Sequence, residues 1–128
     1  MSDPQAMVRE FHEVFGVAVA DRPLQPAPET VELRRSLIEE EKRELFEAMA
    51  GTDLAQVAKE LADLLYVVYG TAVSYGIETL PVFAEVHRSN MEKAPGGVVT
   101  RRADGKVLKP AGWQPPDIAR LIEIQAKR

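Results

Sequence analysis

The sequence contains no cysteine, which excludes a disulfide framework, a zinc–thiolate site and a cysteine nucleophile. It also lacks a long apolar stretch, because the longest such run is about 13 residues and contains Asp63, too short for a membrane span. The first ten residues have no basic start followed by an apolar run, which is not the pattern of a signal peptide. The net charge of −4 gives no nucleic-acid footprint. We therefore expect a cytoplasmic protein without membrane or nucleic-acid partners.

The composition is that of a soluble globular protein. The hydrophobic fraction is 45% and the charged fraction is 28%. A length of 128 residues supports one domain, 1–128, with enough chain to bury a core. Hydrophobic residues recur with helical period through most of the chain. We expect an all-α fold, a bundle of four to five helices built on an antiparallel helical hairpin.

Prolines and glycines divide the chain into the expected elements. Asp3 can cap a first helix, while Gly51 and Gly76 follow the ends of two long ones. Three prolines between residues 17 and 29 forbid a continuous helix there and indicate an extended connection. A small β-hairpin near the C-terminus is expected to turn at Asp104-Gly105. The expected helices cover residues 4–16, about 28–50, 53–75, about 79–92 and 115–127.

Two acidic pairs stand where helices should be apolar. At about 100° per residue, Glu41 and Glu44 share the sector in which Leu33 points toward the core. Glu60 and Asp63 lie one turn apart in a segment that is apolar nearly all round and is therefore expected to be buried. A buried carboxylate without a partner costs several kcal/mol, so such groups are usually paired or metal-bound. The acidic pairs indicate a hard cation such as Mg²⁺ or Mn²⁺.

The turn between the two long helices brings these pairs together. Its two or three residues require the helices to be antiparallel neighbours. Each acidic pair lies about 8 to 11 residues from the turn, so at a rise of 1.5 Å per residue both stand at the same height. We expect Glu41, Glu44, Glu60 and Asp63 to converge between the helices.

Basic residues gather after this acidic centre. Residues 29–63 contain ten acidic and five basic side chains, whereas residues 88–109 contain six basic and two acidic ones. An acidic centre followed by a basic hairpin suits an anion held through metal ions, such as a polyphosphate. The alternative for the basic segment is a solvated hairpin without a ligand.

Other classes of site remain to be compared. The acidic pairs could form an ordinary solvated face with Lys42, Arg43 and Lys59 as salt-bridge partners. A di-iron carboxylate bundle uses Glu-x-x-His, but Ala84 and Arg9 stand three residues before the two histidines, so that motif is missing. A non-catalytic helical interaction module is a third possibility. Metal-dependent release of pyrophosphate would distinguish an enzyme from such a module.

The acidic residues match a known signature. Glu40-Glu41-x-x-Glu44, followed after fifteen residues by Glu60-x-x-Asp63, resembles the EExxE…ExxD signature of all-α nucleoside triphosphate pyrophosphohydrolases. That superfamily includes MazG proteins, dimeric dUTPases and phosphoribosyl-ATP pyrophosphohydrolases. The segments EFHEVFG, KELADLLYVVYG, VFAEVHRSNMEK and RRADGKVLKPAGW look like those of MazG-like dUTP-hydrolysing members. The connection between the second and third helices is shorter here.

The resemblance implies a metal-dependent hydrolase. Glu41, Glu44, Glu60 and Asp63 would hold two or more Mg²⁺ ions, with Mn²⁺ as a substitute. Glu40 or Glu41 would handle the attacking water as the catalytic residue. Attack at the α-phosphorus would release pyrophosphate and a nucleoside monophosphate.

The resemblance and the charge pattern also suggest substrate contacts. The candidates for the β and γ phosphates are the polar residues of the basic segment: Asn90, Lys93, Arg102, Lys106 and Lys109. Candidates for contacts with the base or sugar are His12, Phe15 and Tyr66. A packing role is the alternative for His12, and a core position is the alternative for Tyr66.

The expected substrate is a (deoxy)nucleoside triphosphate, with dUTP as the first choice. dCTP, a modified nucleotide or a phosphoribosyl-ATP-like compound are alternatives, because no residue independently demonstrates uracil selection. The apolar third helix cannot be fully covered within one small chain. We therefore expect a homo-oligomer, a dimer or a tetramer.

Overall fold

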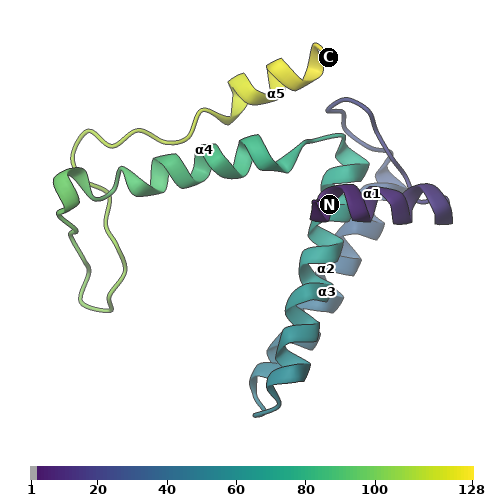
Figure 1. Ribbon diagram of the computed structural model, residues 1–128, viewed down its shortest axis with the longest axis horizontal. Coiled ribbons are helices and arrows are strands. Elements are labelled where there is room, and N and C mark those ends of the chain that lie inside the picture. Colours follow the sequence, from purple (N-terminus) through teal and green to yellow (C-terminus); the bar gives the residue numbers. More distant parts are fainter. Residues whose placement is uncertain (1–2) are drawn as a thin grey trace. The chain divides into compact units, whose positions relative to one another are not determined.

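The computed structural model describes residues 3–128, and these form five α-helices, one short 3₁₀ helix and no strand (Figure 1). The expected all-α fold is confirmed. No helix in this range is long and apolar enough to cross a membrane. The elements are α1 (Pro4–Phe15), α2 (Pro28–Met49), α3 (Leu54–Tyr75), α4 (Thr79–Met91), η1 (Pro95–Gly97) and α5 (Ile118–Ala126).

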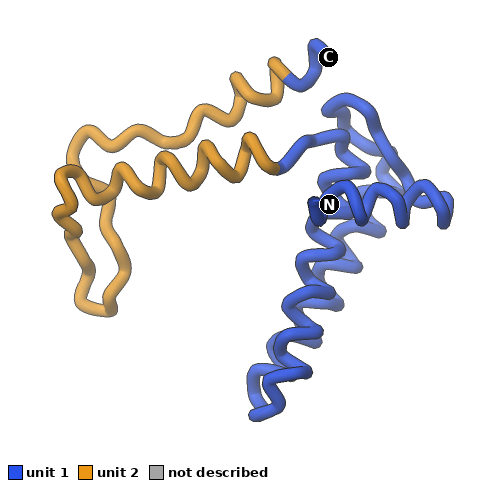
Figure 2. The backbone as a smooth tube through the Cα atoms, viewed as in Figure 1, with its two compact units in different colours: residues 1–79, 125–128 blue, residues 80–124 orange. Residues whose placement is uncertain are grey.

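The chain falls into two compact units (Figure 2). Unit 1 consists of residues 1–79 and 125–128, and unit 2 consists of residues 80–124. The acidic pairs belong to unit 1, whereas the basic segment belongs to unit 2.

Unit 1 is built on the hairpin of α2 and α3. Asp53 begins α3, because its carboxylate accepts hydrogen bonds from the backbone N–H groups of Ala55 and Gln56 at 3.0 and 3.2 Å. The two helices lie side by side, and α1 packs against α3 (Figure 1). The connection from residue 16 to residue 27 contains no helix, as its prolines predict, and Ala20 N–H donates to Val73 O at 3.1 Å. The hairpin therefore has the antiparallel arrangement that its short turn predicts.

A polar cluster that the sequence pattern did not predict lies inside unit 1. Arg34 is buried, and its Nη2 donates to Val67 O at 3.0 Å. His12 is also buried, with Nδ1 at 2.9 Å from Ala18 O, and burial lowers its pKa. A Cβ at residue 70 would lie 2.4 Å from Arg34 Nη2 and 2.9 Å from His12 Nε2. Gly70 therefore leaves the space that both side chains occupy.

The apolar core of unit 1 is smaller than the sequence pattern predicts. Val8, Leu45 and Val73 are the buried apolar residues among those described. Leu33, expected to point toward the core, is 48% exposed, and Phe15 is 68% exposed. The expectation for Leu33 was wrong, because α2 packs mainly against α3 and leaves Leu33 on an exposed side.

Unit 2 contains α4, the hairpin and most of α5. The expected β-hairpin is reduced to one antiparallel bridge between Arg101 and Val107 around the Asp104-Gly105 turn. The last helix begins at Ile118 rather than at Pro115. Prolines 115 and 116 disfavour helical geometry in the residue before each, and Asp117 then caps α5 by accepting from Arg120 N–H at 3.3 Å.

Candidate metal centre

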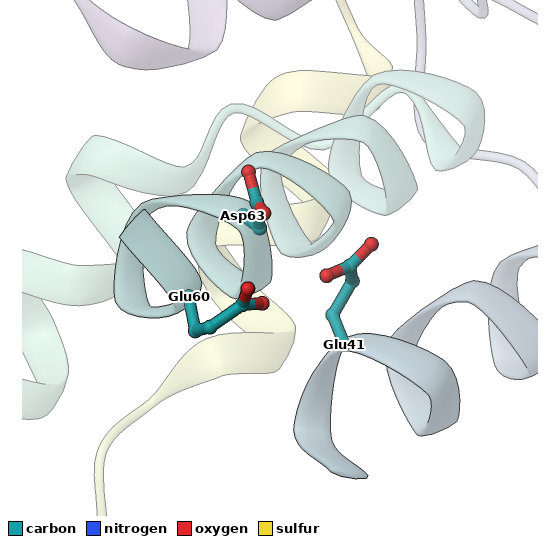
Figure 3. Close-up of side chains that lie close together, drawn as sticks. All are labelled: Glu41, Glu60 and Asp63. Atoms are coloured by element: carbon teal, nitrogen blue, oxygen red, sulfur yellow. The ribbon is translucent and has the colours of Figure 1, made fainter. Parts of the chain in front are cut away.

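Three carboxylates converge between α2 and α3. Glu41 comes from α2, while Glu60 and Asp63 come from successive turns of α3. One oxygen from each lies within 4.8 Å of the other two. Figure 3 shows the Glu41 side chain reaching across the gap toward the two acids of α3. We call these three residues the acidic cluster.

The acidic cluster contains carboxylate oxygens without a partner. Glu60 is only 3% exposed. Among residues 3–128, the buried Oε2 atoms of Glu41 and Glu60 accept no hydrogen bond. Buried polar atoms are nearly always paired, because an unpaired one costs free energy on folding. Carboxylate oxygens left unpaired in this way fit a bound Mg²⁺ or Mn²⁺ ion, which prefers such ligands.

The electrostatics of the cluster indicate a shortage of positive charge. The pKa of Glu41 is raised above its ordinary value, first by burial and then by the negative charges of Glu44, Asp63 and Glu60. A nearby cation would reverse this effect. The same arrangement that disfavours ionised Glu41 therefore favours a bound divalent ion.

Lys59 supplies part of the missing charge. Its Nζ lies 2.7 Å from Asp63 Oδ2 and 3.3 Å from Glu60 Oε1, and the two carboxylates raise its pKa. The salt-bridged alternative is thus realised for two of the three acids. Within residues 3–128, Glu41 has no cationic partner and Glu60 Oε2 remains unpaired.

A Lys59→Met substitution is expected to strengthen divalent metal binding. A metal ion at Glu60 and Asp63 competes with the exposed Lys59 ammonium, which pairs with both carboxylates. We expect a roughly two- to fivefold lower dissociation constant for Mn²⁺, as for the loss of a weak competing ion pair. Isothermal titration calorimetry would measure it, with Lys42→Met, which removes the exposed Lys42–Glu39 pair, as the control. Weaker binding in the Lys59 variant would show that the lysine supports the site.

The other two acids of the signature lie beside the cluster. Glu44 is half-buried and lines an open hollow of about 500 Å³ together with Glu60 and Gln56. It does not belong to the group of three that meet within 4.8 Å, although its charge acts on Glu41. Glu40 is exposed next to Glu41. The structure therefore brings together three of the four expected ligands and places the fourth at their edge.

The five phosphate candidates all belong to unit 2. Arg102 is engaged by Asp104, with Nε 2.9 Å from Oδ1. Lys93 and Lys109 both lie over the ring of Trp113. Asn90 and Lys106 are exposed.

The base and sugar candidates differ in their exposure. His12 is buried and holds Ala18 of the connection, which is a packing role. Phe15 and Tyr66 are exposed, and both contact Phe11, at ring-centroid distances of 4.4 and 5.6 Å. Phe11 was not among the candidates. Its position four residues before Phe15 on α1 is the signal that could have identified it.

Comparison with known proteins agrees with this site. The phosphoribosyl-ATP pyrophosphohydrolase family matches residues 8–90, which include the acidic cluster. The chain is also similar to the uncharacterized protein L479 of Acanthamoeba polyphaga mimivirus, with 36% identity over 74 residues, 55% of this chain. The chain covers only 30% of the length of the viral protein. The family match confirms the expected all-α pyrophosphohydrolase superfamily and extends over more than half of the chain, which therefore belongs to the phosphoribosyl-ATP pyrophosphohydrolase family.

Proposed function

We propose that this protein is a Mg²⁺-dependent pyrophosphohydrolase that cleaves a nucleoside triphosphate, first of all dUTP, between the α and β phosphates. The observation that carries the proposal is the acidic cluster with its two unpaired buried oxygens. It lies within the residues that match a pyrophosphohydrolase family. A cluster of this kind has no structural purpose without a cation, because it costs free energy in the empty state. A non-catalytic metal-binding interaction module would use the same cluster, so metal-dependent release of pyrophosphate is what distinguishes the two.

The proposed roles follow from the exposure of each acid. Glu41, Glu60 and Asp63 would hold the metal, with Glu44 as a further ligand at the edge. Bound Mg²⁺ would neutralise triphosphate charge and lower the pKa of a coordinated water. Glu40 is exposed beside Glu41, so it is free to orient that water and to accept its proton.

The proposed reaction is a hydrolysis at the α-phosphorus. The water oxygen forms a bond to the α-phosphorus, and the bond from that phosphorus to the oxygen bridging the β-phosphorus breaks. Pyrophosphate leaves with the electron pair of the broken bond, and the water proton passes to a carboxylate. The products are a nucleoside monophosphate and pyrophosphate. The basic residues of unit 2 are the proposed contacts of the departing phosphates.

A second candidate substrate is phosphoribosyl-ATP, because the family that matches residues 8–90 is described by that activity. The same acidic cluster would serve either substrate, since both contain an α–β phosphoanhydride. The sequence resemblance to dUTP-hydrolysing members favours dUTP.

A substrate panel tests the proposal. The purified protein would be incubated with Mg²⁺ and dUTP, dCTP, canonical and modified triphosphates or phosphoribosyl-ATP, with pyrophosphate and orthophosphate measured separately. We expect pyrophosphate, released only in the presence of the divalent ion. Orthophosphate as the main product would contradict attack at the α-phosphorus. Absence of hydrolysis for every compound would favour the non-catalytic module.

We also propose that the protein is a homo-oligomer assembled through the outer face of α3. Exposed apolar residues of α3 share one face of the helix, at spacings of seven, four and three residues. They are Leu54, Leu61, Leu65 and Val68. A contiguous apolar face of this kind marks an interaction surface, and a second copy offers the matching one.

A Leu65→Glu substitution is expected to dissociate the oligomer. An unpaired carboxylate buried in the interface costs several kcal/mol, which corresponds to a dissociation constant raised by about a hundredfold or more. Sedimentation equilibrium would measure the mass, and Ser36→Glu would add the same charge at an exposed polar position of α2. A wild-type protein that is monomeric at high micromolar concentration would refute the proposal.

A further inference from the structure

The two oxygens of the Glu60 carboxylate have different surroundings. Oε1 accepts from two donors on α3, Gln56 Nε2 at 2.8 Å and Lys59 Nζ at 3.3 Å. Oε2 is buried and, among residues 3–128, accepts from no donor. Figure 3 shows this carboxylate facing that of Glu41. One oxygen of Glu60 is therefore held twice, while the other is left for a ligand.

The start of α3 places Gln56 for this contact. Its backbone N–H donates to Asp53 Oδ1 at 3.2 Å, so Gln56 lies in the first turn of the helix. Glu60 follows four residues later, and side chains at this spacing lie on the same face of a helix. The contact between Gln56 and Glu60 therefore depends only on the cap and the period of α3.

The two donors to Oε1 differ in charge. The Lys59 ammonium lies closer to Asp63 Oδ2, at 2.7 Å, and a cation at the acidic cluster would repel it. The Gln56 amide is neutral, so it does not oppose a cation and can keep its hydrogen bond when one binds. Carboxylates that ligate a metal are usually held by such an outer hydrogen bond. Gln56 is therefore the donor that can act in the metal-bound state.

The surroundings of Gln56 are acidic. It is exposed and lines the open hollow of about 500 Å³ beside the acidic cluster. Among the described residues that line this hollow, the other polar side chains are those of Glu44, Glu47 and Glu60. Gln56 thus supplies a donor without cancelling the negative charge that attracts a metal ion.

We propose that Gln56 is a positioning residue that makes Glu60 a one-oxygen ligand and thereby favours Mg²⁺ and Mn²⁺ over Ca²⁺. With Oε1 held by the amide, Oε2 alone is free to ligate. Mg²⁺ requires compact, near-octahedral coordination, whereas Ca²⁺ takes more oxygens and accepts both oxygens of one carboxylate. Blocking one oxygen of Glu60 therefore penalises the larger ion. This role rests on the proposed function insofar as the acidic cluster holds a divalent ion.

Calorimetric titration of the metal-free protein with MnCl₂ and, separately, with CaCl₂ tests this role. Gln56→Met keeps the length of the side chain and removes the amide donor. We expect the dissociation constant for Mn²⁺ to rise on the order of tenfold, while that for Ca²⁺ changes by less than about twofold. Equal losses for both ions, or no loss for either, would overturn the proposal.

Gln25→Met is the matched control, because it makes the same substitution at an exposed glutamine in the connection before α2. It should leave both dissociation constants unchanged. Thermal unfolding in EDTA should give Gln56→Met nearly the wild-type Tm, because one exposed contact along a helix contributes little to stability. A large fall in Tm together with equal losses for both ions would assign Gln56 a structural role instead.

A double-mutant cycle tests whether Gln56 acts through Glu60. Glu60→Asp keeps the charge but shortens the side chain by one methylene, so the amide contact at 2.8 Å cannot form in the same geometry. Adding Gln56→Met to this variant should change the Mn²⁺ dissociation constant by less than about twofold, against roughly tenfold in the wild-type background. A full tenfold loss in the double variant would show that Gln56 acts on another group.

The second donor to Oε1 provides a contrast. Lys59→Met removes a competing charge and should strengthen Mn²⁺ binding, whereas Gln56→Met removes a neutral donor and should weaken it. Opposite effects from two donors to one oxygen support the assigned roles. Weaker binding in both variants would refute the distinction between the charged and the neutral donor.

Pyrophosphate release from dUTP separates the role of Gln56 from the proposed function. Mg²⁺-dependent release by the wild type, with the Mn²⁺ and Ca²⁺ affinities of Gln56→Met unchanged, would refute the role of Gln56 and leave the function intact. A preference for Mn²⁺ over Ca²⁺ that depends on Gln56, in a protein that releases no pyrophosphate, would support the role of Gln56 and refute the proposed hydrolysis.

Discussion

A Glu41→Gln substitution is expected to abolish divalent metal binding while stabilising the metal-free protein at neutral pH. The first effect follows from the position of Glu41, the only member of the acidic cluster on α2. Loss of an outer partner of a metal ligand costs about 10- to 100-fold in affinity, so loss of a ligand should cost at least about a hundredfold. Hydrolysis should fall by a similar factor.

The second effect follows from the raised pKa of Glu41. Burial and the nearby carboxylates favour its protonated form in the folded state, so folding is penalised once the group ionises. The penalty is absent below the ordinary pKa of 4.5 and grows as the pH rises from there through the raised folded value. Glutamine is neutral at every pH and can donate a hydrogen bond to the neighbouring acids. The stability of the variant should therefore not fall with rising pH through this position, as it does in the wild type.

Thermal unfolding between pH 4 and 8 measures both effects. In EDTA the variant should unfold at a higher temperature than the wild type at pH 7, and the difference should vanish near pH 4. Added Mn²⁺ should stabilise the wild type alone, because a ligand that binds only the folded state raises its stability. Glu39→Gln provides the control, since Glu39 is exposed on the same helix and pairs with Lys42 at 3.0 Å. Equal Mn²⁺ stabilisation of wild type and Glu41→Gln would contradict the metal site.

The acidic cluster could be predicted because it follows from the period and rise of an α-helix and from the length of one turn. Helical period gives the face of each acid, and the short turn gives their relative height. These two quantities bring Glu41, Glu60 and Asp63 together, as the structure shows. They do not give side-chain rotamers, which is why Glu44 was expected inside the group and lies at its edge.

Other features depend on particular contacts that no period reveals. Arg34 is buried because Gly70 of the next helix leaves space for the guanidinium, and helical period does not indicate that space. The indole of Trp113 donates a hydrogen bond to Ser89 O on α4, although the two residues are 24 positions apart. Contacts between residues distant in the sequence require the folded structure.

Gly76→Ala is expected to destabilise the protein far more than Gly16→Ala, although both glycines end a helix with φ of +71°. An L-residue in this left-handed region costs roughly 1–2 kcal/mol, and that cost is common to both variants. A Cβ at residue 16 would meet nothing within 4 Å. A Cβ at residue 76 would stand 2.1 Å from the backbone oxygen of Arg22, which no side-chain rotation can relieve.

The connection between α1 and α2 would have to move away from α3 to accept that methyl group. Leu24 N–H donates to Tyr75 O at 3.0 Å in the same region, so the movement also threatens a backbone hydrogen bond. Overpacking of this kind adds about 1–3 kcal/mol, giving a total near 2–5 kcal/mol for Gly76→Ala against about 1–2 kcal/mol for Gly16→Ala. Urea denaturation monitored by circular dichroism measures both. Equal losses would mean that the connection yields freely, and then its contacts with α3 contribute little to the stability of unit 1.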